Sequence, residues 1–480
     1  MVWKKAFDAI KASLGLVDEA QWILTDSTQF DNLKPDASLQ QLVIGLDFGT
    51  AFTKVVIGEQ RVKYAVPFRA FTDGNNPFLL PSFLAVINDG GECFLGRSDN
   101  TTLAVDNMKM RLIERDFSDE TKTYCAAYLA LVLRYCRGWL LHTHRGTYKN
   151  RRLSWYINIG LPTDGYDDAY LVDTYSVIVR IAWAVSVLPG PITLSRIQAY
   201  LDMNYDDAPL PEPYKSRLLH LDFINTYPEF AVQLAGYVRS PKRQESLHML
   251  VDVGAGTLDV TTFNVYKNKE GDDLYPIFAQ EVRPFGVRYL INERLIGDGH
   301  EQYANISPFQ NIPDDDEFAS RFDLTIEQLH EVDRPFKKKV MTLIREIMKY
   351  TKERRYRQDK QWSNGVPTFL CGGGASARLY IDIFKQLEGS NPPYKILPTQ
   401  LEIPDDLEAP GLSRMGYNRL SVAYGLSYDP FDIGEIRKKS MVDDDVDPKV
   451  SNIGKQTCPR CRGTGEPIGR CPECNGCGWI

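Results

Sequence analysis

The stretch LVIGLDFGTAFTKVVIGE, residues 42–59, places an acidic residue and a glycine turn between two apolar runs. MLVDVGAGTLDVTTFNV, residues 249–265, repeats the arrangement, and its Asp252 follows Asp47 by 205 positions (252 minus 47). Apolar runs rich in β-branched residues on either side of a turn predict two strands joined as a hairpin. The chain therefore has two predicted strand–turn–strand units, each with a carboxylate where its first strand enters the turn.

The glycines of these turns, Gly49 in the first and Gly254 and Gly256 in the second, indicate an anion site. A glycine-rich turn lets backbone N–H groups face a bound anion without interference from side chains. The neighbouring carboxylates would repel a phosphate unless a cation lay between them, and magnesium does this, often through retained waters. Two such units facing each other predict a site for a magnesium–triphosphate. A third glycine turn, residues 372–374, would let a nucleoside approach the backbone.

Length and composition indicate a globular protein with more than one domain. The chain has 480 residues, of which 43% are hydrophobic and 25% charged, so it can bury substantial cores. Its net charge of −7 argues against a protein built mainly to bind nucleic acid. No segment approaches the roughly 20 apolar residues of a membrane span, and no export signal is evident, so we expect a cytoplasmic location.

Strand-like and helical patterns alternate along the body, which predicts an α/β fold. Residues 1–40 are expected to form a helical extension, packed on the body or anchoring the chain to a membrane or partner. Residues 41–432 form the main domain. Block charge and few apolar residues predict a flexible acidic linker over 433–456. The cysteine-rich residues 457–480 form a separate module.

The nine cysteines fall into two groups. Four lie in apolar surroundings and are expected to be buried thiols: Cys93, Cys125, Cys136 and Cys371. The others lie in CPRCRGTG and CPECNGCG, two copies of C-x-x-C-x-G-x-G. Such paired knuckles suit one tetrahedral zinc bound by four thiolates, here Cys458, Cys461, Cys471 and Cys474. Cys477 is surplus to this set, and a redox dithiol pair is the competing interpretation.

The three turns in this order resemble those of the actin, sugar-kinase and heat-shock-chaperone superfamily of ATPases. The matching segments are GLDFGTAFTKVV, VDVGAGTLDVT and LCGGGASARL. Within the superfamily, the seventy-kilodalton heat-shock chaperones of the DnaK type are the most similar. PEFAVQLAGYV, NMKMRLIERDFSDE and RLSVAYGLSY also resemble their segments, so the likeness spans residues 42–430.

The resemblance implies a duplicated ribonuclease-H-like domain with two lobes, residues 41–240 and 241–432, around an ATP or ADP site. It implies that Asp47 and Asp252 hold magnesium through water, and that Asp259 supports the magnesium shell. Glu229 would orient or deprotonate the attacking water.

The remaining implied contacts are with the nucleotide. Thr50 would contact phosphate and Thr257 the γ-phosphate, and the implied cofactor contacts also include Gly49, Gly254, Gly256, Gly372, Gly373 and Gly374. Two lysines are candidates to neutralise the charge that develops on the transferred phosphoryl group: Lys109, one position from the lysine of the chaperones, and Lys54, which matches the lysine of actin. Arg378 would stack on adenine.

The chain also departs from the chaperone pattern. About fifty residues follow residue 430, too few for a peptide-binding β-sandwich, and the segment MVDDDVDP is acidic where the chaperones have an apolar linker. The tail resembles half of the cysteine-rich region of DnaJ-type co-chaperones.

We therefore expect a chaperone-like ATPase that hydrolyses ATP slowly and uses its zinc tail to engage a client or co-chaperone. The alternatives are an actin-like ATPase that assembles into filaments or other oligomers, a small-molecule kinase, and a nucleotide-binding switch without turnover.

Overall fold

The computed structural model describes residues 39–437 apart from 73–75, 88–90, 97–100, 149–150, 163–167, 204–214, 216–218, 269–270, 272 and 298–311. The predicted zinc module and almost all of the predicted extension and linker lie outside the described residues. The described part is a mixed α/β structure, which confirms the predicted fold class. None of its helices is long and apolar enough to cross a membrane.

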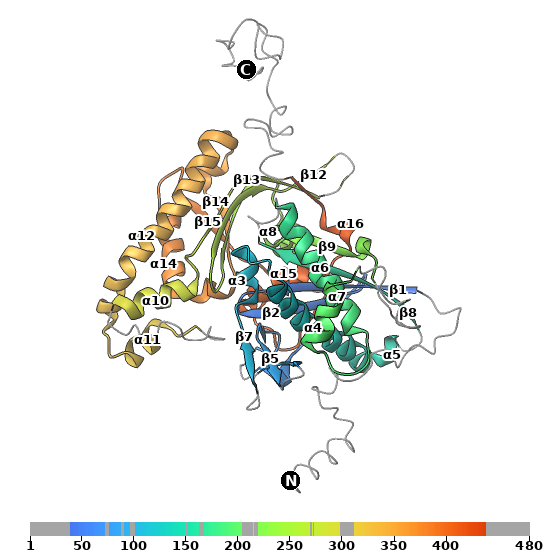
Figure 1. Ribbon diagram of the computed structural model, residues 1–480. Coiled ribbons are helices and arrows are strands. Elements are labelled where there is room, and N and C mark those ends of the chain that lie inside the picture. The colour runs from blue at the N-terminus through green and yellow to red at the C-terminus, as the bar shows by residue number, and fades with distance from the viewer. Residues whose placement is uncertain are drawn as a thin grey trace, which may run out of the picture.

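Two seven-stranded sheets form the framework (Figure 1). The first has the order β16-β3-β2-β1-β8-β9, with β4 also paired to β2. Its strands are β1 (Leu39–Phe48), β2 (Phe52–Gly58), β3 (Lys63–Ala65), β4 (Leu80–Pro81), β8 (Arg152–Leu161), β9 (Ile224–Pro228) and β16 (Leu407–Glu408).

The second sheet has the order β12-β13-β11-β10-β14-β15, with β17 also paired to β13. Its strands are β10 (Leu247–Val253), β11 (Leu258–Asn264), β12 (Tyr266–Lys267), β13 (Asp273–Arg283), β14 (Val366–Cys371), β15 (Ile396–Thr399) and β17 (Glu435–Arg437). A separate three-stranded sheet contains β5 (Leu84–Ile87), β6 (Glu92–Leu95) and β7 (Leu103–Val105).

The two large sheets share one pairing scheme. In the first, β1 is antiparallel to β2 and parallel to β8, which is parallel to β9. In the second, β10 is antiparallel to β11 and parallel to β14, which is parallel to β15. The two predicted hairpins are therefore β1–β2 and β10–β11, and they occupy equivalent places in their sheets.

Helices pack in layers on both sides of each sheet. The helices on the side of the first sheet are α3 (Met108–Ile113), α4 (Asp119–Thr143), α5 (Arg145–Tyr148), α6 (Ala169–Ser186) and α7 (Leu194–Leu201). The second has α10 (Val287–Gly297), α11 (Asp315–Arg321), α12 (Ile326–Tyr350), α13 (Gln361–Asn364) and α14 (Arg378–Glu388). Figure 1 shows α10, α12 and α14 on the opposite side of the molecule from α4, α6 and α7.

Three further helices lie between the sheets: α8 (Glu229–Gln233), α9 (Ala235–Val238) and α15 (Arg414–Leu426). One buried cluster joins their side chains, such as Phe230 and Tyr417, to Val56 of the first sheet and Leu250 of the second. Short turns complete the chain: the 3₁₀ turns η2 (Arg69–Phe71), η6 (Leu221–Phe223) and η9 (Gly373–Ser376), the π-helical turn η8 (Thr351–Arg355), and α16 (Pro430–Ile433).

Glycines allow the helices between the sheets, α8, α9 and α15, to pack closely on neighbouring backbone. A Cβ on Gly45 of β1 would lie 2.3 Å from the carbonyl oxygen of Ala423 in α15. A Cβ on Gly425 would lie 1.8 Å from the carbonyl oxygen of Val232 in α8. Such distances exclude any side chain, so α15 packs directly on the backbone of β1 and of α8.

The chain returns to its first sheet near its end. β16 pairs with β3, and α15 packs on β1, β2 and β8. The boundary drawn at residue 240 thus separates the two hairpins, while residues 407–426 belong spatially with the first sheet. The four cysteines expected to be buried thiols are buried and free.

Candidate functional site

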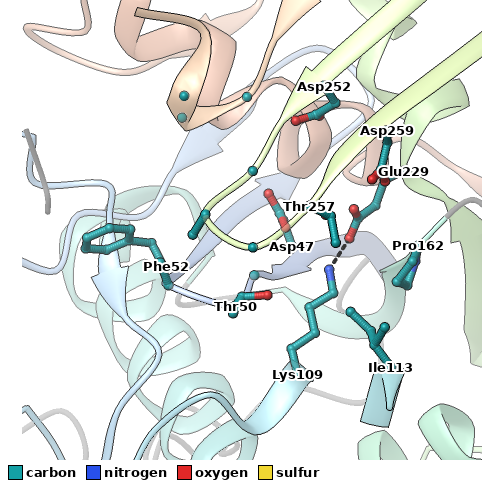
Figure 2. A pocket seen from close by; sticks show the side chains of 18 of the residues that line it. Asp47, Thr50, Phe52, Lys109, Ile113, Pro162, Glu229, Asp252, Thr257 and Asp259 are labelled. Carbon is teal, nitrogen blue, oxygen red and sulfur yellow. Dashed lines mark hydrogen bonds and ion pairs between the residues drawn. The ribbon is translucent and has the colours of Figure 1, made fainter. Parts of the chain in front are cut away.

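A pocket of about 280 Å³ lies where the two hairpins face each other (Figure 2). Of the residues predicted for the nucleotide site, all but Arg378 line it: Asp47, Gly49, Thr50, Lys54, Lys109, Glu229, Asp252, Gly254, Gly256, Thr257, Asp259, Gly372, Gly373 and Gly374. The two sheets thus bring together segments that are more than three hundred positions apart (372 minus 47).

The first turn is fixed by contacts from β4 and β2. Ser82 donates its hydroxyl to the carbonyl of Gly49 (2.7 Å), and its amide donates to the carbonyl of Ala51 (2.9 Å). A Cβ on Gly49 would lie 2.3 Å from the carbonyl oxygen of Phe52. A side chain at Gly49 would therefore force the turn open.

The second turn packs on the start of α10. The amide of Gly254 donates to the carbonyl of Thr257 (2.8 Å) and closes the turn. The carbonyls of Gly254 and Ala255 accept hydrogen bonds from the amides of Val287 (3.1 Å) and Arg288 (2.8 Å). With its carbonyls bound to α10, the turn is expected to present N–H groups on its opposite side, toward the pocket.

The third glycine turn presses against the second hairpin. Gly372 has a positive φ of 83°, and a Cβ there would lie 2.1 Å from Oδ1 of Asp252. A Cβ on Gly374 would lie 2.3 Å from Cγ1 of Val253. Both the backbone angle and the space exclude other residues at Gly372, so the third turn and the Asp252 carboxylate form one packed unit.

The residues opposite the two aspartates differ between the hairpins. Asp47 pairs in register with Lys54, and the Lys54 ammonium lies 2.7 Å from Oδ2 of Asp47. Asp252 pairs in register with Asp259, seven positions later in the chain as in the first hairpin (54 minus 47; 259 minus 252). The first hairpin therefore neutralises its own aspartate, whereas the second brings a second acid beside it.

Lys109 and Glu229 form an ion pair across the pocket (Figure 2). Lys109 lies on α3 and is buried, and Glu229 is the first residue of α8. Burial acts to lower the pKa of Lys109, but the negative charges of Glu229 and Asp47 outweigh it, so the pKa is raised. Lys109 is thus held as a cation. The structure brings both candidate lysines into the pocket, Lys54 against Asp47 and Lys109 against Glu229.

The second hairpin brings two acidic side chains together, Asp252 and Asp259, and burial opposes the ionisation of both. Burial raises the pKa of Asp252 to about 6; Gln233, which donates from Nε2 to Oδ2 of Asp252 (2.6 Å), opposes this rise. Burial and the nearby Asp252 and Glu229 raise the pKa of Asp259 well above its ordinary value. Oδ1 of Asp259 and Oε1 of Gln233 are buried and accept no hydrogen bond from a described residue.

This donor set fits a hydrated magnesium ion. Five carboxylates line the pocket with two lysines, and two buried oxygens, Oδ1 of Asp259 and Oε1 of Gln233, can each accept a further hydrogen bond. Among the described residues, no three His, Cys, Asp or Glu side chains are close enough to ligate one ion together. An ion between these carboxylates would therefore keep waters in its shell, as magnesium does readily.

Arg378 lies outside the pocket. It is the first residue of α14, its side chain is 60% exposed, and it lies near Asp382 and Asp315. It lines a neighbouring cavity of about 950 Å³ that shares Gly372 and Gly373 with the pocket.

Seven polar or charged residues that the sequence analysis did not single out also line the pocket: Arg115, Asp168, Gln233, Arg288, Asn292, Asn418 and Arg419. Gln233 follows Glu229 by four positions on α8, so helical spacing would have placed the two on one face. Arg288 donates to Oδ1 of Asn107 (2.9 Å) and so links α10 to the start of α3. Arg288 belongs to no quoted segment, and Arg419, the first residue of the segment RLSVAYGLSY, was given no role there.

No protein-family model matches this chain, and no curated protein matches it.

Replacing Asp252 with Asn should stabilise the ligand-free protein at alkaline pH. The folded-state pKa is about 6 against 3.8 for a free carboxyl, so ionisation costs stability above pH 6, by at most about 3 kcal/mol. The cost disappears as the pH falls from 6 toward 3.8, because the folded carboxyl is then protonated. The melting temperature of Asp252→Asn, measured without divalent cations, should exceed that of the wild type more at pH 8 than at pH 5.

The exposed Asp173 on α6 provides a matched control. Asp173→Asn should change the melting temperature little at either pH. An Asp252→Asn protein that is destabilised equally at both pH values would show that Asp252 is ionised without cost, contrary to this account.

Proposed function

We propose that this protein is a chaperone-like ATPase, a divergent member of the actin and heat-shock superfamily with a duplicated ribonuclease-H-like nucleotide domain. The observation that carries the proposal is the convergence of both Asp–Gly turns, the third glycine turn and the Lys109–Glu229 pair on one pocket. The shared strand order of the two sheets supports it. Each motif is weak alone, but an accidental match has no reason to bring all of them together.

In the proposed mechanism the two hairpins bind the phosphates from both sides. Asp47 and Asp252 would hold magnesium through water, and the ion would neutralise phosphate charge. Turn N–H groups, with Thr50 and Thr257, would fix the phosphate oxygens. Ionised Asp252 is required for this role, and because its pKa is about 6 it is mostly ionised at neutral pH, at a cost in stability that a bound cation would offset.

Hydrolysis requires an oriented water. The water oxygen would attack the γ-phosphorus, the bond to the β-bridging oxygen would break, and the products would be ADP and inorganic phosphate. Glu229 lies beside Lys109 at the pocket wall, where it would orient the water and accept its proton. Lys109 would stabilise the charge on the transferred group, while Lys54, bound to Asp47, would keep the first hairpin neutral.

We expect slow magnesium-dependent ATP hydrolysis by the purified protein, with a rate per chain that does not depend on protein concentration. Asp252→Ala and Glu229→Gln should each reduce kcat by about a hundredfold or more, since they remove the ion's support and the group that orients water. Glu402→Gln is the matched control: Glu402 is an exposed carboxylate bound to Lys242 away from the pocket. A steady-state assay with purified variants measures all four proteins.

The same assay separates the alternatives. A rate that rises above a threshold concentration, together with polymers that pellet, would favour an actin-like filament protein. ATP binding with equal inactivity of the wild type and Asp252→Ala would reject hydrolysis and leave a kinase lacking its substrate or a nucleotide-held switch.

We further propose that Cys458, Cys461, Cys471 and Cys474 bind one structural zinc and that the resulting knuckle engages a protein partner. This proposal rests on sequence alone, because these residues lie outside the described part of the chain.

Metal analysis of the full chain should find about one zinc per molecule. The double variant Cys458→Ser/Cys461→Ser should lose the metal, while Cys477→Ser should keep it, because Cys477 is surplus to the four ligands. Equal zinc content in all three proteins would contradict the ligand assignment. ATP hydrolysis in a chain ending at Ile433 would show whether the pocket works without the tail.

A further inference from the structure

Arg419 reaches the pocket from α15, the helix between the two sheets. Its guanidinium carbon lies 5.0 Å from the centre of the Phe52 ring, at the end of the first turn. The third turn is also close: a Cβ on Gly373 would lie 3.3 Å from Nε of Arg419. The guanidinium thus lies near both the end of the first glycine turn and the third glycine turn.

Both neighbours fit a planar cation. An aromatic ring beside a guanidinium gives a favourable cation–π contact. Gly373 leaves space for the guanidinium that a larger residue would fill. Burial lowers the pKa of Arg419 to about 10, which still leaves it charged at neutral pH. The chain therefore maintains a partly buried positive charge in this pocket, at a cost in desolvation.

The position of this charge differs from that of the two lysines. Lys54 and Lys109 lie beside Asp47 and Glu229. Arg419 lies beside the third turn, where a nucleoside would approach. Figure 2 shows the Phe52 ring pointing away from the Lys109–Glu229 pair. A polyphosphate with its terminal group near Lys109 and its nucleoside near Gly373 would therefore pass Arg419 with its nucleoside-proximal phosphate.

We propose that Arg419 binds the phosphate nearest the nucleoside and makes the pocket selective for nucleotides over nucleosides. This inference rests on the proposed nucleotide function. Guanidinium N–H groups match phosphate oxygens in a planar fork that an ammonium cannot reproduce, and Phe52 and Gly373 hold that fork in place. The contact is made equally before and during hydrolysis, so it contributes to binding rather than to the chemical step.

The test compares binding of Mg·ADP and of adenosine to the full-length protein, by competition with a fluorescent ADP analogue. Arg419→Met should weaken Mg·ADP binding by about ten- to a hundredfold, the usual range for losing hydrogen bonds to a charged group. Adenosine binding should not change. In hydrolysis, KM should rise by a similar factor while kcat changes little. Arg419→Lys, which keeps the charge without the fork, should lose less.

Arg414→Met is the matched control, because Arg414 lies on the same helix, is exposed, and donates to Gln400 (3.0 Å). It should bind Mg·ADP like the wild type. If Arg419→Met does not fold, Arg419→Lys decides: Mg·ADP binding weakened several-fold with adenosine unchanged supports the inference.

Two results would overturn it: unchanged Mg·ADP binding in the Arg419 variants, or equal weakening of ADP and adenosine, which would indicate a structural role. A wild type that binds neither ADP nor ATP would instead refute the proposed function itself, and this inference with it.

Discussion

The arrangement of the pocket depends on an excess of acidic groups, held where burial opposes their ionisation. Asp47 has a cation beside it and Glu229 has another, but Asp252 and Asp259 face each other across one hairpin. Burial makes ionisation of these two acids unfavourable, and among the described residues no lysine forms an ion pair with either, as Lys54 does with Asp47. Two acids held so close together destabilise the ligand-free protein when they ionise. A cation bound between the hairpins would offset the repulsion between their carboxylates.

Close backbone packing delivers the charges to one place. Gly372 lets the third turn contact the Asp252 carboxylate, and Gly45 and Gly425 let α15 lie directly on β1 and α8. The sheets are therefore coupled both by this close backbone packing and by the buried cluster that contains Phe230 and Tyr417. The Arg288–Asn107 hydrogen bond adds a second connection near the pocket, between α10 and α3. A ligand bound by both hairpins would alter these contacts. In that way, binding in the pocket would change the position of one sheet relative to the other.

Local sequence was sufficient to predict the hairpins and the third turn. The alternation of apolar residues with Asp and Gly specifies strand, turn and strand within twenty residues, and the structure has β1–β2 and β10–β11 at those places. The start of α12 at Ile326 is also encoded locally, because Thr325 and Gln328 form a capping box there. Contacts between distant segments were harder to predict. Arg378 follows the third turn directly in sequence, yet α14 carries it away from the pocket, whereas Arg419 enters from a helix that returns to the first sheet. That path depends on tertiary packing that no local pattern encodes.

The central claim is that one magnesium–nucleotide contacts all three glycine turns at once. Amide hydrogen exchange of the full chain, followed by mass spectrometry with and without Mg·ADP, tests it most directly. The account predicts slower exchange on Mg·ADP binding in three separate stretches, residues 47–54, 252–259 and 371–376, at the same nucleotide concentration. Protection confined to one of the hairpins, or to segments outside these turns, would contradict a site shared by the two sheets.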